Sequence, residues 1–324
     1  MKDEYLYYAN ANQVRGVEEY SLIEGRGANM RMMHVRNGLG LELTIAVDRC
    51  LDIYRLTFKG DNMSYYSACG NVSPTYYDSR KSEMVRSFTG GFLTTCGFDN
   101  VGEVCTDNGE DLPLHGRISN QPASHAYWVE EIDEFIINGI VKNCSLSLEK
   151  LQLHREIHVS KLENNFYIKD TIRNIGEYET PCMVLYHMNM GYPLLSEDCE
   201  LTIPSGSVKG RDEFASKELD LWNNIGGPKS QRREVCYYHE FEKDGFAKIY
   251  NPVIKKGIEI SYDAKSLPAF TQWNSFCKYD YVLGLEPGNC NPEGRVKVKA
   301  ANKLKTLKEQ EEVTYCINIK ILEG

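Results

Sequence analysis

Residues 165–174 read NFYIKDTIRN and carry the plainest fold signal in this 324-residue chain. Apolar side chains such as Phe166 and Ile168 alternate there with polar or charged ones. A period of two is typical of a β-strand that buries one face. The same alternation returns at 41–47 (LELTIAV) and at 317–321 (INIKI). The chain is therefore predicted to be rich in half-buried strands.

The segment 145–160, SLSLEKLQLHREIHVS, alternates in the same way but changes phase near Glu149. Such a change predicts a tight turn or a bulge between two strands. Helical patterns are few, and the best candidates are 78–87 and 211–222. We therefore predict one all-β domain over residues 1–324, an antiparallel β-sandwich of two packed sheets with a few short helices. Glycine-containing pairs predict turns between the strands: Asn37-Gly38, Asn108-Gly109, Asn138-Gly139, Gly226-Gly227 and Pro287-Gly288.

Composition narrows the classes of partner. The chain has 37 basic and 46 acidic side chains, a net charge of -9, which argues against a nucleic-acid partner. It shows no membrane span and no secretory pattern in MKDEYLYYANANQ, so we expect a cytoplasmic protein that needs no membrane. The 11 cysteines include no CxxC pair, and neither nucleotide-binding glycine motif occurs. We expect reduced cysteines and no cofactor or bound metal; a homodimer is one option that the sequence leaves open.

Three short segments set an ionisable side chain beside glycine or proline: LPLHGR at 112–117, YHMNMGYP at 186–193 and LGLEPGN at 283–289. Their ionisable residues are His115, His187 and Glu286. Glycine lets backbone or ligand approach closely. Apolar runs precede His187 and Glu286, so both are predicted to lie at strand ends that present a polar group. A carboxylate and an imidazole are a natural acid–base pair near neutral pH.

The order of these segments resembles the aldose 1-epimerase (galactose mutarotase) superfamily, and a bacterial branch of it most closely. The segments 88–102 (FTGGFLTTCGFDNVG) and 48–53 (DRCLDI) add to the match, which runs from about residue 40 to residue 295. The resemblance implies a galactose mutarotase-like sandwich and a free sugar as the small-molecule partner. It also implies an isomerase that interconverts the sugar's α and β anomers by opening and closing the ring.

By that resemblance, Glu286 takes the proton from the anomeric hydroxyl, His187 protonates the ring oxygen, and His115 positions the sugar. The sequence departs from the family pattern after the second histidine, at 188–191, and in Arg117 directly after the His-Gly pair. These departures leave the substrate open. The residues that we expect to bind substrate are Arg117, Asn189, Asp99, Asn100, Arg86, Arg49, Gln272 and Trp273.

Two other functions fit the same residues. Two histidines and a glutamate can form a facial triad for a divalent metal in an isomerase or oxygenase. The same fold also serves as a non-catalytic carbohydrate-binding module, since a fold does not fix a function. Metal analysis of the purified protein distinguishes the first alternative. The second has no need of both His187 and Glu286.

Overall fold

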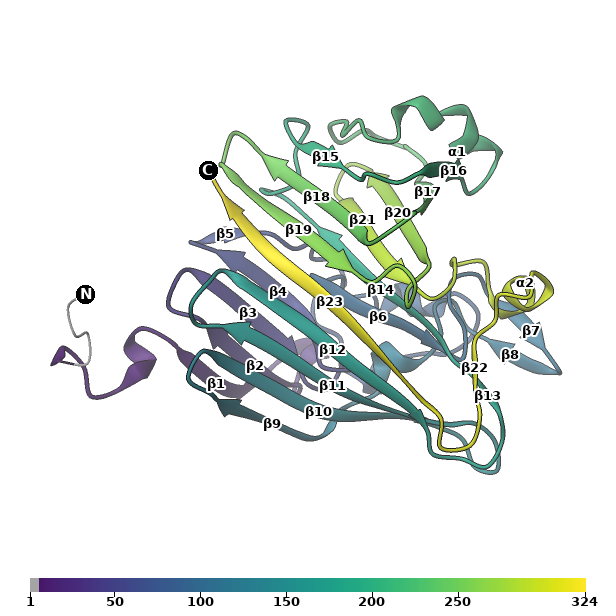
Figure 1. Ribbon diagram of the computed structural model, residues 1–324, viewed down its shortest axis with the longest axis horizontal. Helices are drawn as coiled ribbons and strands as arrows, with labels where there is room; N and C mark the ends of the chain where they lie inside the picture. The colour runs from purple at the N-terminus through teal and green to yellow at the C-terminus, as the bar shows by residue number, and fades with distance from the viewer. Residues whose placement is uncertain (1–5) are drawn as a thin grey trace.

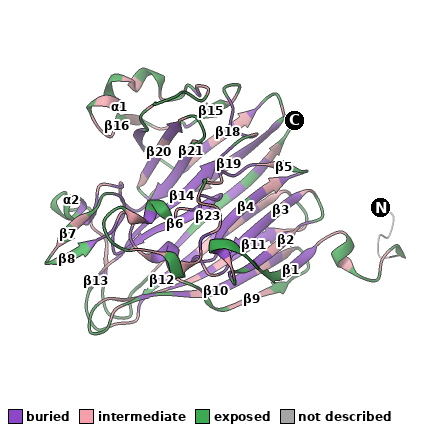
Figure 2. Ribbon diagram, turned by 180° about the vertical axis from the view of Figure 1, so that it is seen from behind, coloured by how far each residue is buried: buried purple, intermediate pink, exposed green. Residues whose placement is uncertain are grey.

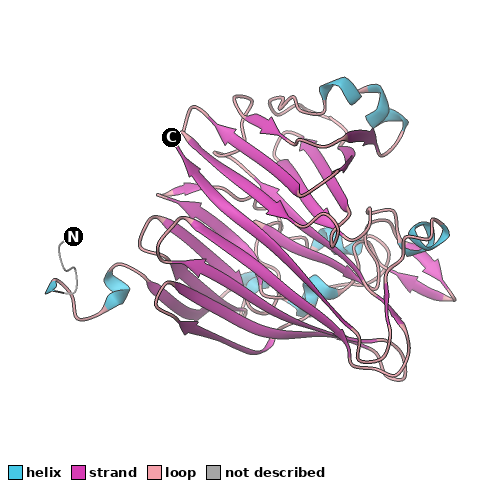
Figure 3. Ribbon diagram, viewed as in Figure 1, coloured by secondary structure: helices cyan, strands magenta, loops and turns pink. Residues whose placement is uncertain are grey.

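The computed structural model describes residues 6–324 and is built almost entirely from antiparallel strands (Figure 3). This confirms the predicted all-β class. The expected domain extent and the N-terminal interpretation include residues 1–5, which lie outside the described part. No helix among the described residues is long and apolar enough to span a membrane. All 11 cysteines are free.

An eight-stranded sheet forms one layer (Figure 1), ordered β15-β18-β19-β23-β12-β11-β10-β9. Its strands are β9 (Ser124–Glu130), β10 (Glu134–Cys144), β11 (Lys150–Ser160), β12 (Asn165–Asn174), β15 (Glu200–Thr202), β18 (Gly245–Asn251), β19 (Lys256–Tyr262) and β23 (Glu312–Glu323).

Two further sheets cover this layer. The six-stranded sheet, ordered β16-β17-β20-β21-β14-β6, contains β6 (Leu93–Phe98), β14 (Met183–Met190), β16 (Ser207–Gly210), β17 (Val235–Glu240), β20 (Ala269–Phe276) and β21 (Tyr281–Gly288). The five-stranded sheet contains β1 (Gly16–Ser21), β2 (Arg31–Arg36), β3 (Leu41–Ala46), β4 (Asp52–Phe58) and β5 (Asp61–Asn62).

The remaining elements are small. Two-stranded ribbons pair β7 (Cys105–Asp107) with β8 (Glu110–Leu112) and β13 (Thr180–Pro181) with β22 (Thr306–Leu307). The α-helices are α1 (Glu213–Lys217) and α2 (Arg295–Ala300). Single 3-10 turns occupy Ala11–Gln13, Gly25–Gly27, Pro74–Tyr76, Glu83–Arg86, Ile118–Asn120 and Leu219–Leu221. Of the two predicted helical stretches, 78–87 is mostly irregular and contains one 3-10 turn, whereas most of 211–222 is helical, in α1 and the 3-10 turn that follows it.

The core lies between the layers, where the buried faces of all three sheets meet (Figure 2). Ile168 of β12 and Ile317 of β23 are paired neighbours in it, as their alternating patterns predict. The phase change in 145–160 is a turn: the backbone N–H of Ser145 donates to the carbonyl of Glu149 at 2.9 Å. Burial of one strand face therefore explains the periodicity that the sequence shows.

Two of the turns predicted from glycine-containing pairs were wrong. Asn138-Gly139 lies inside β10, where a Cβ on Gly139 would come 2.4 Å from Leu51 Cδ1. Pro287-Gly288 continues β21, and a Cβ on Gly288 would come 2.8 Å from Leu185 Cδ1. Both glycines serve close packing rather than a turn.

One ionic cluster lies within the core and joins the layers. Arg155 of β11 donates to Asp52 at 2.8 Å and to Asp170 at 2.8 and 2.6 Å. Thr95 accepts from Arg155 at 2.9 Å and donates to Asp52 at 2.6 Å. The Tyr186 hydroxyl donates to Asp170 at 2.9 Å. These five residues, called the Arg155 cluster below, are all buried and all hydrogen-bonded.

Candidate active site

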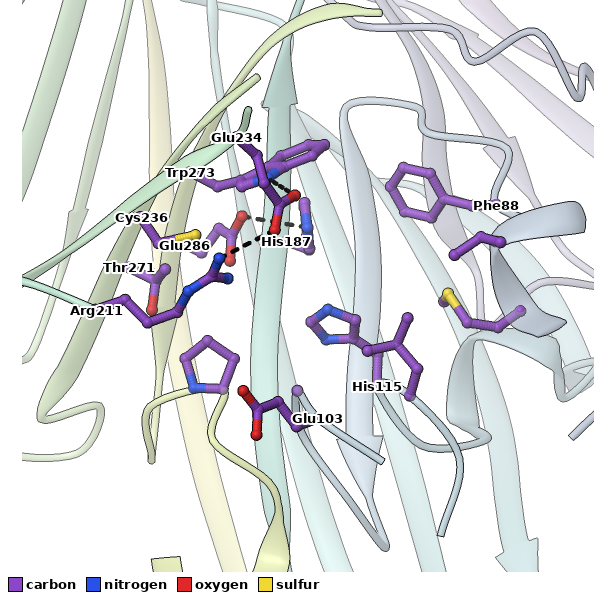
Figure 4. Close-up of a pocket in the computed structure, with 15 residues that line it drawn as sticks. Phe88, Glu103, His115, His187, Arg211, Glu234, Cys236, Thr271, Trp273 and Glu286 are labelled. Carbon is purple, nitrogen blue, oxygen red and sulfur yellow. Dashed lines mark hydrogen bonds and ion pairs between the residues drawn. The ribbon is translucent and has the colours of Figure 1, made fainter. Parts of the chain in front are cut away.

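A cavity of about 240 Å³ lies against the outer face of the six-stranded sheet, away from the main core (Figure 4). Strands β14, β17, β20 and β21 form its floor, and loops around residues 84–88, 102–103 and 114–115 form its rim. The residues that line it are Met84, Val85, Phe88, Gly102, Glu103, Leu114, His115, His187, Arg211, Glu234, Cys236, Thr271, Trp273, Glu286 and Pro292.

Strand alternation places His187 and Glu286 in this cavity. On β14, Tyr186 and Met188 point into the core, so His187 between them points outward. On β21, Leu285 points into the core and Glu286 points outward. Both residues lie inside their strands and not at the predicted strand ends. A rigid sheet therefore fixes their separation.

Gly284 makes room for the Glu286 carboxylate. A Cβ at residue 284 would lie 2.2 Å from Glu286 Oε1 and 3.1 Å from the Cβ of Trp273. The carboxylate thus folds over a position where the strand has no side chain. Any larger residue would displace it.

A strained loop brings His115 to the cavity. Its φ is +58°, a left-handed value that non-glycine residues seldom adopt, and Gly116 follows with φ +70°. Its backbone N–H donates to Gly102 and its carbonyl accepts from Gly97, each at 2.9 Å. A Cβ on Gly116 would come 2.3 Å from the Gly97 carbonyl oxygen. The turn therefore requires glycine at position 116.

The three side chains meet as the sequence predicts. His187 Nε2 lies 3.2 Å from Glu286 Oε1, and the rings of His115 and His187 are 5.6 Å apart. The approach of Glu286 lacks hydrogen-bond geometry, because Oε1 is a buried atom without a hydrogen-bond partner among the described residues. Three more atoms are buried and have no hydrogen-bond partner among the described residues: Nδ1 of His115, Nδ1 of His187 and Oγ1 of Thr271. Buried polar atoms are seldom left so, and these atoms are therefore available to water or to a polar ligand.

Burial controls the ionisation of all three residues. It raises the pKa of Glu286 well above its usual value. Burial, with electrostatic repulsion from His115 acting in the same direction, lowers the pKa of His187 to about 3. Burial also lowers the pKa of His115 to about 4. Removing water disfavours whichever form is charged. Perturbed groups that share a cavity favour a functional site.

Arg211 and Glu234 form the cavity wall on the Glu286 side, across from His115 (Figure 4). Arg211 Nη2 lies 3.1 Å from Glu234 Oε1, and Trp273 Nε1 donates to Glu234 Oε2 at 2.8 Å. The Trp273 ring meets the His187 ring edge-on at 5.1 Å. An indole face and a set of polar tips suit a ligand with both C–H surfaces and hydroxyls.

Of the eight predicted substrate-binding residues, the cavity includes Trp273. Gln272 points to the other face of β20, where His239 and Asn274 engage it. Asn189 is buried and donates to the carbonyls of Gly91 and His187. Strand alternation explains why Gln272 lies away from the cavity that Trp273 lines, because adjacent residues of a strand face opposite ways.

The remaining five lie outside the cavity lining. Asp99 is buried and ion-paired with Arg117, which also lies 3.4 Å from Glu110. Asn100 donates to the carbonyls of Glu103 and Pro113, which holds the loop below His115. These three residues contact one another and the loop below His115, outside the lining of this cavity.

The two predicted upstream arginines are also elsewhere. Arg49 is buried and donates to the Val72 carbonyl at 3.0 Å. Arg86 is largely exposed and pairs with Glu83 at 3.0 Å. The arginine that does line the cavity, Arg211, was missed because no motif surrounds it. Glu234 was missed as well, although it directly precedes β17 and so lies at the start of a strand.

The metal alternative finds no geometric support. Across residues 6–324, no three side chains of the His, Cys, Asp or Glu type are arranged to hold a metal ion. His115, His187 and Glu286 meet around a cavity rather than around a common point.

Solved structures share this architecture and define the class. A candidate aldose 1-epimerase from Klebsiella pneumoniae superposes with a TM-score of 0.89 at 22% identity, over 97% of this chain and 87% of that one. A galactose mutarotase-like protein from Clostridium acetobutylicum gives 0.68 at 14%, over 97% and 100%. Galactose 1-epimerase from Lactobacillus acidophilus gives 0.66 at 14%, over 96% and 99%. The chain has the galactose mutarotase-like fold.

A family model matches residues 27–321, and the chain belongs to that family, described as a domain of unknown function (DUF4432). No curated protein sequence matches the chain. The chain thus shares its fold with proteins named as epimerases. At sequence identities of 22% or less, this likeness shows the fold and not the activity.

Proposed function

We propose that the protein interconverts the anomers of a free sugar in the cavity between His115 and Trp273. The observation that carries the proposal is the His187–Glu286 pair, which is buried, lies 3.2 Å apart, lines the cavity and includes atoms without a hydrogen-bond partner among the described residues. A sugar offers hydroxyls and a ring oxygen to such atoms.

Ring opening moves two protons. The Glu286 carboxylate takes the proton of the anomeric hydroxyl while the C1–O5 bond breaks and C1 becomes a carbonyl. The His187 imidazolium gives its proton to O5. Rotation about C1–C2 then exposes the other carbonyl face, and reclosure runs the two transfers backward. His115 donates or accepts a hydrogen bond beside the reacting centre.

Burial has a definite place in this scheme. The charged pair starts the step, and the neutral pair, with the proton on Glu286 and a neutral His187, accompanies the open-chain sugar. Burial raises the pKa of Glu286 and lowers that of His187, so it favours the neutral pair. Hydroxyls that donate to Glu286 offset this preference in the closed form. The two apparent pKa values then belong to the pair.

The size of the cavity supports a small ligand. Its volume of about 240 Å³ lies near the lower end of the ~300–1,000 Å³ typical of small-molecule sites. A single sugar unit fits that scale better than a longer saccharide. Three carboxylates and one guanidinium line it, which favours a neutral sugar over a phosphorylated one.

The test follows a freshly dissolved pure anomer by polarimetry or NMR over a panel of aldoses. Glu286→Gln and His187→Asn should each slow the catalysed rate by about 10²–10⁴-fold, the usual contribution of a positioned acid or base. Both should keep the fold by circular dichroism. Glu240→Gln and His125→Asn, which change exposed residues, are matched controls that should keep full rate.

Full activity in both site variants would contradict the roles assigned. Absence of catalysed anomerisation with every sugar, together with tight sugar binding, would support the binding-module alternative. Activity lost on chelation and restored by a divalent metal would support the metal alternative.

A further inference from the structure

The cavity wall carries one ion pair that the proposed proton transfers do not use. Arg211 follows β16, and its backbone N–H donates to the Cys236 carbonyl at 3.0 Å, which extends the β16–β17 ladder. The next residue, Asp212, caps α1 by accepting from the Ala215 N–H at 2.8 Å. The backbone is therefore fixed on both sides of Arg211.

Glu234 is fixed from two directions. Arg211 Nη2 and Trp273 Nε1 engage separate oxygens of its carboxylate, at 3.1 and 2.8 Å. Figure 4 shows the pair beside the Glu286 carboxylate, with Trp273 next to His187. Both members of the ion pair line the same cavity as Glu286. A charged pair held this rigidly acts on Glu286 through space.

The two charges act in opposite directions. After burial, the negative charge of Glu234 raises the pKa of Glu286 and the positive charge of Arg211 lowers it. His115 experiences the same two charges with the same signs. Other titratable groups that face Glu286 come from the surrounding strands and loops: His187, Cys236, Cys96, His115 and Glu103.

We infer that Arg211 and Glu234 are positioning residues that hold opposite charges beside Glu286 in one cavity, so that each cancels part of the other's electrostatic field there. The effect expected on the pH–rate profile rests on the proposed function, whereas the titration of Glu286 itself can be measured without any activity. The side chains of Arg211 and Glu234 are 27% and 45% exposed, so added salt weakens their field.

The test removes each charge separately. Arg211→Gln leaves Glu234 unbalanced, so the pH–rate profile should move to higher pH, by on the order of one unit. Glu234→Gln leaves Arg211 unbalanced, so the profile should move to lower pH by a similar amount, while the glutamine oxygen still accepts from Trp273. The double variant should return close to the wild-type profile. The shifts of both single variants should shrink between 0.05 and 1 M salt, where the Debye length falls to about 3 Å.

Arg233→Gln is the matched control. Arg233 adjoins Glu234, pairs with Asp212 and lies outside the cavity lining, so its removal changes the same net charge. It should leave the profile in place. A second readout needs no activity: ¹³C-carboxyl NMR of labelled glutamates, with the Glu286 signal identified by its loss in Glu286→Gln, reports the titration directly.

Opposite shifts in the two single variants, with cancellation in the double variant, support the inference. An active protein whose three variants all keep the wild-type midpoint overturns it and leaves the proposed function intact. A protein that anomerises no sugar overturns the proposed function, and the NMR titration then still decides the inference. Shifts of the same sign in both single variants would indicate structural damage and overturn it as well.

Discussion

Two groups of buried charges, one between the layers of this sandwich and one on the outer face of its six-stranded sheet, differ in how they are partnered. The Arg155 cluster, on the core side, joins its guanidinium to two carboxylates with hydrogen bonds of 2.6 to 2.8 Å. The His187–Glu286 pair, on the outer face of the six-stranded sheet, approaches to 3.2 Å and leaves Glu286 Oε1 without a hydrogen bond from the described residues.

The contrast separates two uses of buried charge. A fully hydrogen-bonded cluster offsets its desolvation and ties the layers together, whereas an unpartnered one retains binding capacity for a ligand. Chemical type alone does not separate them, because each contains carboxylates and each is buried. Removing a member of the first should therefore cost stability, and altering the second should cost activity.

The largest expected effect is on the Arg155 cluster. Arg155→Met leaves the carboxylates of Asp52 and Asp170 buried in the core without their guanidinium partner. Breaking a buried ion pair in this way costs about 3–5 kcal/mol of unfolding free energy. Urea unfolding measures this. The control, Arg173→Met on the exposed face of β12, should cost less than about 0.5 kcal/mol. Glu286→Gln, which removes an unpartnered carboxylate, should change stability by less than about 1 kcal/mol. If Arg155→Met and Glu286→Gln lowered the unfolding free energy by similar amounts, the distinction between the hydrogen-bonded cluster and the unpartnered pair would be wrong.

Gly284→Ala tests the site through geometry alone. The new Cβ would lie 2.2 Å from Glu286 Oε1, so the carboxylate must move away from its present place beside His187. A displacement near 1 Å can cost about 10²-fold in rate. Stability should change little, since the obstructing atom ends a flexible side chain. Gly226→Ala, where no atom lies within 4 Å of the new Cβ, is the control. A Gly284→Ala rate equal to that of Gly226→Ala would show that this placement is not needed.

The sequence predicted the strands and the meeting of His115, His187 and Glu286 better than the walls of the cavity. The run at 165–174 matches β12 end to end, because burial of one face imposes a period that the sequence must show. His115 was identifiable from its glycine, which a left-handed turn requires. Arg211 and Glu234 reach the cavity through the β16–β17 pairing, a long-range contact with no local pattern. Arg117 and Asp99 follow a motif, yet they pair with each other beneath the rim.

The pH dependence of stability provides a smaller effect. Burial lowers the pKa of His187 to about 3 in the folded chain, against about 6.5 when unfolded, so the unfolded chain holds more protons between these values. Stability therefore falls as pH falls through this window. His187→Asn removes this contribution, so its loss of stability from pH 7 to pH 5 should be about 2 kcal/mol smaller than that of the wild type. The exposed His125→Asn should follow the wild type; if His187→Asn does so too, His187 is not held neutral by burial.

The smallest expected effect is at Arg86, which the sequence placed among the substrate-binding residues. Its neighbours Met84 and Val85 line the cavity, but its own guanidinium turns outward, is 76% exposed and pairs with Glu83. An exposed pair of this kind contributes little, so Arg86→Ala should change stability by less than about 0.5 kcal/mol. The anomerisation rate should stay within about twofold, because no charge on the cavity wall is altered. A tenfold loss would mean that Arg86 turns inward when sugar binds, and the loop at 83–88 would then belong to the site rather than to its rim.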